Sequence, residues 1–117
     1  FIKEVYNFPS DLFSKVMGTG TEHIGIIIRE YPENNVFLGQ VKDSSLGILL
    51  INIDLRSGRS EEQLESFKIL LMQKLSNITN VPIENMYVVY TTHIGGDFRF
   101  SDRNLDDWKS SESIINP

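Results

Sequence analysis

Cysteine is missing from this 117-residue sequence, and histidine occurs only twice. The lack of cysteine excludes disulfides, thiolate chemistry and cysteine-ligated metals. Because the two histidines are also far apart in the sequence, we expect no metal site and no other cofactor. Positive charge is scarce as well, with 11 basic against 16 acidic residues and a net charge of −5. This balance argues against partners such as nucleic acid or an anionic membrane surface, so any bound anion must be captured locally.

Long apolar runs are missing too. No apolar stretch reaches the roughly 18 residues of a membrane-spanning helix, and no basic-then-apolar signal opens the chain. These absences predict a soluble, cytoplasmic protein that does not act in a membrane. With 40% hydrophobic residues, the chain can still bury an ordinary core. We therefore expect one domain over residues 1–117.

The second half carries the clearest pattern, a strand, a helix and a strand. Residues 46–55 (LGILLINIDL) and 86–92 (MYVVYTT) are rich in the β-branched and aromatic residues typical of strands. Between them, Ser60 can cap a helix with Gln63 as its capping-box partner, which predicts a helix from Ser60 or Glu61 to residues 77–80. Apolar residues recur along it at helical spacing, and its expected core face is Leu64, Phe67, Leu71, Leu75 and Ile78. A helix between two strands of one sheet predicts parallel pairing.

The first half shows a weaker version of the same pattern. Residues 1–8 (FIKEVYNF) predict a strand, residues 9–17 a short helix that starts near Pro9 or Ser10, and residues 23–30 and 36–41 two further strands. The sequence therefore predicts an α/β (α+β) fold, with two β-α-β units that form a four- to five-stranded mixed sheet and helices on one face. Residues 101–117 form a polar tail in which only Leu105 and Trp108 suggest docking.

Two arginines stand where the first of the two clear strands ends and the helix begins, in the stretch LRSGRS (residues 55–60). A guanidinium offers a planar fork of donors to a carboxylate, and an adjacent helix amino terminus adds backbone N–H groups. Arg56 and Arg59 are therefore candidate anion-binding residues. In the alternative interpretation, Arg56 pairs with Asp54 or Glu62, and Arg59 is a solvated surface residue.

Three stretches in this order, TGTEHIGIIIREYPENNVFLGQ, LRSGRSEEQ and VPIENMYVVYTT, resemble the tautomerase superfamily, and within it the group of cis-3-chloroacrylic acid dehalogenase. The similarity extends over residues 15–100. It implies a fold of β-α-β units, assembly into trimers or related hexamers, and an amino-terminal proline that acts as catalytic base or acid. It also implies that Arg56 and Arg59 bind the carboxylate of a small unsaturated or 2-oxo acid.

Further site residues follow from the same resemblance. Tyr90 occupies the position of a strand tyrosine that helps to position or activate water. Asp97 is the nearest carboxylate to the place of a water-activating glutamate, although a loop aspartate that satisfies a glycine turn is the alternative. Lys15 stands where the group has a catalytic histidine on the first helix, so a cation replaces a neutral donor, and we place Lys15 among the substrate-binding residues.

The largest departure from the resembled group is Phe1, which stands where the catalytic proline is expected. Either a proline-bearing strand precedes residues 1–8 in the natural protein, or residues 1–8 are the first strand and the proline has been lost. The α-amino group of Phe1 could then act only as a weak base.

These residues leave two functions open. The first is an isomerase of the tautomerase type, or a divergent cis-3-chloroacrylic acid dehalogenase-like protein, with enol–keto tautomerisation expected rather than dehalogenation. The second is a non-catalytic trimeric binding or scaffold protein. Helices on one face would leave the other sheet face apolar, so we expect a homotrimer that covers this face. The residues expected on that face are Ile26, Ile28, Leu49, Ile51 and Val88.

Overall fold

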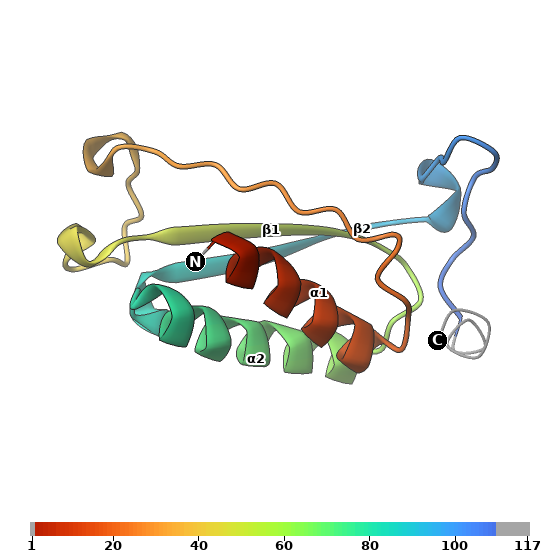
Figure 1. The fold of residues 1–117 in the computed structure, drawn as a ribbon, viewed down its shortest axis with the longest axis horizontal. Helices are drawn as coiled ribbons and strands as arrows, with labels where there is room; N and C mark the ends of the chain where they lie inside the picture. The colour runs from red at the N-terminus through yellow and green to blue at the C-terminus, as the bar shows by residue number, and fades with distance from the viewer. Residues whose placement is uncertain (1, 110–117) are drawn as a thin grey trace.

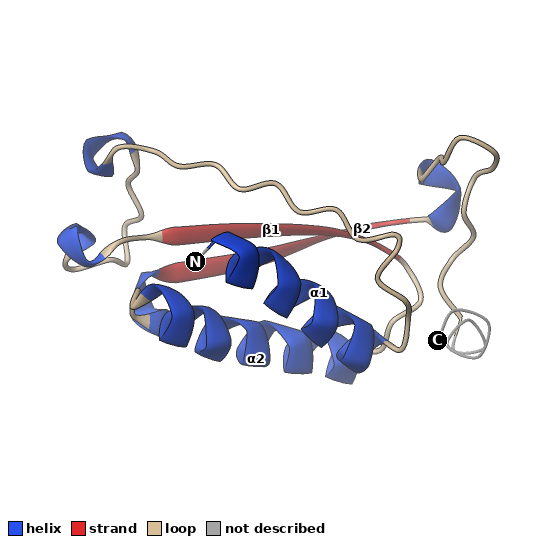
Figure 2. Ribbon diagram, viewed as in Figure 1, coloured by secondary structure: helices blue, strands red, loops and turns tan. Residues whose placement is uncertain are grey.

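The computed structural model describes residues 2–109 and contains two helices and two strands as its main elements (Figure 1). In chain order they are α1 (Ile2–Met17), β1 (Leu49–Arg56), α2 (Glu61–Thr79) and β2 (Met86–His93). Both helices lie on the same side of the sheet, as the colouring by secondary structure shows (Figure 2). The short 3₁₀ helices are η1 (Glu33–Asn35), η2 (Ser44–Leu46), η3 (Ile83–Asn85) and η4 (Gly95–Asp97).

The two strands are parallel, in a register that pairs Leu49 with Met86 at one end and Arg56 with His93 at the other. The strand, helix and strand predicted for the second half are therefore confirmed. The predicted size of the sheet is wrong, because within residues 2–109 the sheet has two strands rather than four or five. The described chain accordingly contains one β-α-β unit, β1-α2-β2, and not two.

Residues 23–30 and 36–41, both predicted as strands, form no strand in the structure. Residues 24–32 run as a long extended segment, drawn in orange in Figure 1. Side-chain exposure alternates along it, and Ile27 is 79% exposed. The prediction failed because β-branched residues favour an extended backbone but do not make a strand without a hydrogen-bonded neighbour.

Residues 1–8 were also predicted as a strand, and here the structure shows α1 instead for Ile2 onward. Val5, Leu12 and Val16 recur at helical spacing and pack towards the core, which explains why the helix wins. The helix does not start near Pro9 but runs through it. Proline has no N–H to donate to the preceding turn, and the hydroxyl of the next residue, Ser10, donates to the carbonyl of Tyr6 at 3.0 Å. The interpretation of residues 1–8 as the first strand is thus excluded.

Helix α2 begins and ends as predicted. The hydroxyl of Ser60 accepts a hydrogen bond from the backbone N–H of Gln63, and the side chain of Gln63 accepts one from the backbone N–H of Ser60, which completes a capping box. Asn80 caps the carboxyl end of the helix in a left-handed conformation (φ 63°), and its N–H donates to the carbonyl of Ser76. No helix within residues 2–109 has both the length and the apolarity needed to cross a membrane.

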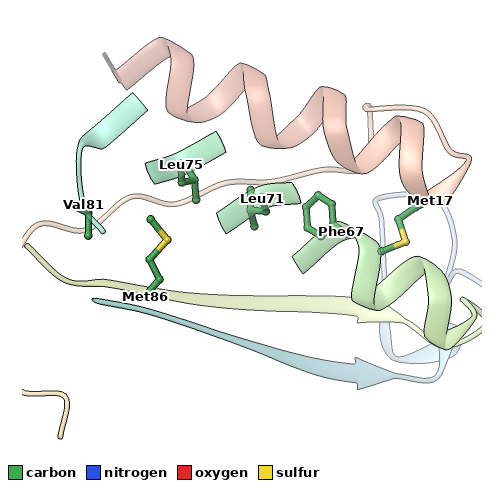
Figure 3. Packing of buried hydrophobic residues seen from close by; sticks show 6 residues of the cluster. All are labelled: Met17, Phe67, Leu71, Leu75, Val81 and Met86. Atoms are coloured by element: carbon green, nitrogen blue, oxygen red, sulfur yellow. The ribbon is translucent and has the colours of Figure 1, made fainter. Parts of the chain in front are cut away.

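The core lies between the two helices and the sheet, and Figure 3 shows its six buried side chains. They are Met17, Phe67, Leu71, Leu75, Val81 and Met86. Leu49 and Ile51 pack against this cluster, so they face the helices and not the open side of the sheet as predicted. Because strand residues alternate between faces, the open face carries Leu50, whose partner in the register is Tyr87. These two side chains are 52% and 48% exposed.

Candidate functional site

The carboxyl ends of α1, β1 and β2 lie at the same end of the molecule as the amino end of α2 (Figure 1). The carboxyl ends of β1 and β2 meet there, and the backbone N–H of Ser57 donates to the carbonyl of His93 at 2.7 Å. The last turn of α1 touches the first turn of α2, where the side chain of Gln63 donates to the carbonyl of Val16 at 3.3 Å. In α/β proteins, ligands bind beyond the carboxyl ends of parallel strands. A ligand-binding site is therefore expected at this end of the molecule.

The link between β1 and α2, residues 56–60, is called here the arginine turn. Arg56 is the last residue of β1, and Arg59 directly precedes Ser60, the amino-terminal cap of α2. Gly58 between them has a φ of +124°, a conformation that side-chain-bearing residues rarely adopt. The turn thus places two half-buried guanidinium side chains beside a helix amino terminus.

Residues 105–109, called here the strap, lie against the arginine turn. The guanidinium of Arg56 donates through Nη1 to the carbonyl of Asp106 at 2.7 Å. The backbone N–H of Trp108 donates to the carbonyl of Ser57 at 2.8 Å. A Cβ atom on Gly58 would lie 2.1 Å from the carbonyl oxygen of Trp108, so only glycine allows this approach. The docking predicted for Trp108 is confirmed, since the residue is only 8% exposed.

Arg59 lies against two aromatic rings. Its guanidinium carbon is 4.6 Å from the centre of the Trp108 ring and 5.6 Å from the centre of the Phe13 ring on α1. An arginine stacked on aromatic faces is held in a fixed orientation by those rings. Arg59 is therefore not the solvated surface residue of the alternative interpretation. The Arg59 side chain projects from the arginine turn and lies between Phe13 of α1 and Trp108 of the strap.

Tyr90, predicted to assist catalysis, lies away from the arginine turn. It is paired with Ile53, three residues before the end of β1, which puts it roughly 10 Å from the strand end. Its hydroxyl donates to the carbonyl of Leu64 on α2 at 2.7 Å. Burial, with a smaller contribution from the negative charge of Glu65, raises the pKa of Tyr90 to about 12. At neutral pH the phenol is a hydrogen-bond donor and not a base, and its catalytic role stays a prediction.

Two other predicted residues lie at the same end as the arginine turn. Lys15 is exposed in the last turn of α1, and Asp97 is exposed at the end of η4, which follows β2. Neither is shown to contact a group of the turn, so their assigned roles also stay predictions. Phe1, the third residue predicted to be catalytic, lies outside the described residues.

Sequence reasoning missed one polar pair at this end. His93 closes β2 on the open face of the sheet, and its Nε2 lies 3.0 Å from Oδ1 of Asp54 on β1. The two residues are 39 positions apart, and only the parallel register brings them together. Among residues 2–109 no group of three or more histidine or carboxylate side chains is arranged to hold a metal ion.

The solved structures most informative for this chain share its fold. A member of the cis-3-chloroacrylic acid dehalogenase family called N1 matches with a TM-score of 0.81 at 18% identity, over 90% of this chain and 73% of that one. A fused 4-OT solved as an asymmetric trimer matches with a TM-score of 0.66 at 18% identity, over 82% and 77%. Malonate semialdehyde decarboxylase matches with a TM-score of 0.66 at 18% identity, over 86% and 79%.

No protein-family model and no curated protein sequence matches the chain. At 18% identity the three structures carry information about the fold alone. All three are tautomerase superfamily members. The predicted resemblance is thus confirmed in three dimensions, and the chain has the fold of the tautomerase superfamily.

Proposed function

We propose that this chain forms a cytoplasmic protein that binds a small 2-oxo or unsaturated carboxylate at the arginine turn and interconverts its enol and keto forms. One observation carries the proposal. Arg56 ends β1 and Arg59 directly precedes the amino-terminal cap of α2, in a fold shared with a dehalogenase family, a 4-OT and a decarboxylase. Fold alone does not define an activity, so the proposal depends on the chemistry of the Arg56 and Arg59 side chains.

The geometry suits a carboxylate. The chain has a net charge of −5, so long-range attraction does not draw an anion to it and local donors must hold the ligand. The stacked guanidinium of Arg59 offers a planar fork, and the amino terminus of α2 adds the positive end of the helix dipole. In the enol–keto reaction, a proton leaves the enol oxygen, the C–O bond becomes a carbonyl, and a proton is added to the other carbon of the former C=C bond. The negative charge that develops on the oxygen is stabilised by these same donors.

Tautomerisation suits these residues better than hydrolytic dehalogenation. Dehalogenation needs a group that activates water, and the candidate for it, Asp97, is an exposed aspartate on a 3₁₀ helix. A proton transfer between oxygen and carbon needs no activated water. Halide release from 3-haloacrylates should therefore be slow or undetectable, and rapid release would contradict this choice of reaction.

Calorimetric titration with pyruvate and phenylpyruvate tests the binding step. Each Arg→Ala change at Arg56 or Arg59 should weaken binding by about 1.5 to 3 kcal/mol, the range for hydrogen bonds to charged groups. Lysine should restore binding only in part, because it lacks the fork of the guanidinium. The exposed Arg99, which follows η4, provides a matched control, and Arg99→Ala should leave affinity unchanged. Equal affinity of the Arg56/Arg59 double variant and the unmodified protein would refute the proposal.

The second candidate is a binding protein without catalysis. It is favoured by Tyr90, whose hydroxyl donates to the carbonyl of Leu64 on α2 and lies away from the arginine turn. Spectrophotometric conversion of phenylenolpyruvate distinguishes the two candidates. A rate above that of buffer that falls in the Arg56/Arg59 double variant supports the isomerase, whereas binding without such a rate supports the binding protein. Intact-mass measurement of the natural protein would show whether a proline begins it.

A homotrimer remains part of the proposal. The open face of the sheet exposes Leu50 and Tyr87, and a fused 4-OT with this fold was solved as an asymmetric trimer. Exposed apolar side chains on a sheet face are commonly covered by a second copy of the chain. Sedimentation equilibrium that shows a stable monomer at micromolar concentration would argue against the trimer.

A further inference from the structure

Trp108 carries a polar group that the fold does not use. The side chain is 8% exposed, and within residues 2–109 no group accepts a hydrogen bond from its buried indole N–H. Tryptophans that are buried in proteins usually find such a partner, because a buried donor without one loses the hydrogen bond it made to water. The indole N–H is therefore a buried hydrogen-bond donor without an acceptor among the described residues.

The donor lies beside the arginine turn. The ring that bears it is stacked on the guanidinium of Arg59, with 4.6 Å between the guanidinium carbon and the ring centre. The strap holds the ring there by backbone contacts, since the N–H of Trp108 donates to the carbonyl of Ser57 and the side chain of Asp107 accepts from the backbone N–H of Gly95. An indole fixed in this way is preorganised, so a ligand that reaches it pays little ordering entropy.

From this juxtaposition we propose that Trp108 is a specificity-determining residue, whose indole N–H donates to the oxygen beside the carboxylate of the ligand. This inference rests on the proposed function. While Arg56 and Arg59 bind the carboxylate, the indole N–H donates a hydrogen bond to the neighbouring 2-oxo or enol oxygen. A simple carboxylic acid lacks that oxygen and leaves the N–H without a partner, and sites built to hydrogen-bond a ligand oxygen discriminate in this way against ligands that lack it.

The test compares 2-oxobutanoate with butanoate, in which a methylene group replaces the 2-oxo carbonyl. Calorimetry with the unmodified protein should show 2-oxobutanoate bound roughly 10-fold more tightly, as expected for one added hydrogen bond to a charged or polarised group. Trp108→Phe keeps an aromatic ring over Arg59 but removes the N–H, so the ratio of the two affinities should fall to about one. A preference that survives in Trp108→Phe would overturn the inference.

A second measurement covers the case in which Trp108→Phe does not fold. Trp108 is the only tryptophan of the chain, so its indole gives a single ¹H–¹⁵N cross-peak in the unmodified protein. The peak should move downfield on titration with 2-oxobutanoate and move much less with butanoate. An unmoved peak together with measurable binding overturns the role of Trp108 and leaves the proposed function standing. If neither acid binds, the proposed function fails, and the inference fails with it.

Discussion

Buried polar groups are treated differently at the two ends of the sheet. At the amino ends of the strands, Asn85 is 4% exposed, and its side-chain amide donates to the carbonyls of Asp43 at 3.0 Å and Gly47 at 2.8 Å. At the carboxyl ends, Trp108 is almost as buried, yet its indole N–H has no acceptor within residues 2–109. Within the described residues, the buried polar group at the first end is thus satisfied by hydrogen bonds of the chain itself, whereas the one at the second end is not.

The open face of the sheet changes character along the same direction. Near the amino ends it presents Leu50 opposite Tyr87, and near the carboxyl ends it presents Asp54 beside His93. The apolar half suits contact with another protein surface, and the polar half suits contact with water or a charged ligand. The open face is thus apolar near one end of the strands and polar near the other.

The largest expected effect concerns Asn85. Asn85→Ala removes two hydrogen bonds that a buried amide makes, each contributing about 1.5 kcal/mol, so the free energy of unfolding should fall by about 3 kcal/mol. Urea denaturation measures this loss, and Asn34→Ala at an exposed position of η1 is the matched control. Affinity for 2-oxo acids should not change in the folded variant. A loss below about 1 kcal/mol would mean that these hydrogen bonds contribute less than expected.

Next in size is a pair of neighbouring glycines at the carboxyl end. A Cβ atom on Gly95 would lie 1.8 Å from the carbonyl carbon of Asp106 in the strap, whereas one on Gly96 would meet nothing within 4 Å. Gly95→Ala should displace the strap and cost about 2 kcal/mol of stability, and Gly96→Ala should not displace it. Fluorescence of Trp108 reports the displacement as a shift to longer wavelength. Equal spectra for the two variants would show that the strap does not depend on this close approach.

A smaller effect is expected on the apolar half of the open face. If Leu50 is buried between copies of the chain, Leu50→Lys should weaken assembly by about 1.5 kcal/mol per protomer. Sedimentation equilibrium would then show lighter species at low protein concentration. Ile69→Lys on the exposed side of α2 replaces a residue of similar exposure and should leave the mass unchanged. Equal behaviour of both variants would place the contact between copies elsewhere.

The smallest effect appears only in alkali. Because the pKa of Tyr90 is raised to about 12, the folded protein keeps this phenol protonated at pH values where the unfolded chain, with the ordinary value of 10.0, has lost the proton. The contribution to stability is therefore complete below pH 10 and is lost as the pH rises towards 12. Thermal denaturation between these pH values should show a steeper loss for the unmodified protein than for Tyr90→Phe. Tyr87→Phe serves as the exposed control.

The sequence was a good guide where local signals agreed with one another. The capping box at Ser60, the helical spacing after it and the β-branched residues before Met86 all predict the same β-α-β unit, and the structure shows it. The signals of the first half conflicted. Pro9 suggested a helix start and the apolar residues before it suggested a strand, but packing against α2 decided for one continuous helix. Residues 23–30 have strand composition but find no strand to pair with among residues 2–109, and composition cannot reveal that.

The site could be predicted in part for a similar reason. Arg56 and Arg59 are close in sequence and stand at a recognisable strand-to-helix junction. Trp108 could be predicted to dock, since it is a large apolar residue in a polar tail, but its contact with Arg59 depends on how the chain returns to the arginine turn. The pair of His93 and Asp54 depends on strand register in the same way. Contacts between distant parts of the chain were the ones that sequence reasoning could not supply.

The parallel pairing of β1 with β2 also constrains the order in which the chain folds. Residues that become neighbours, such as Leu49 and Met86, are separated by the whole of α2, and closing such a long loop before any contact rewards it is slow. If α2 forms first, the two strand segments start closer together and have less distance to diffuse before they pair. The capping box at Ser60 stabilises the first turn of that helix. We therefore expect hydrogen bonds outside the sheet to increase the rate at which β1 and β2 pair.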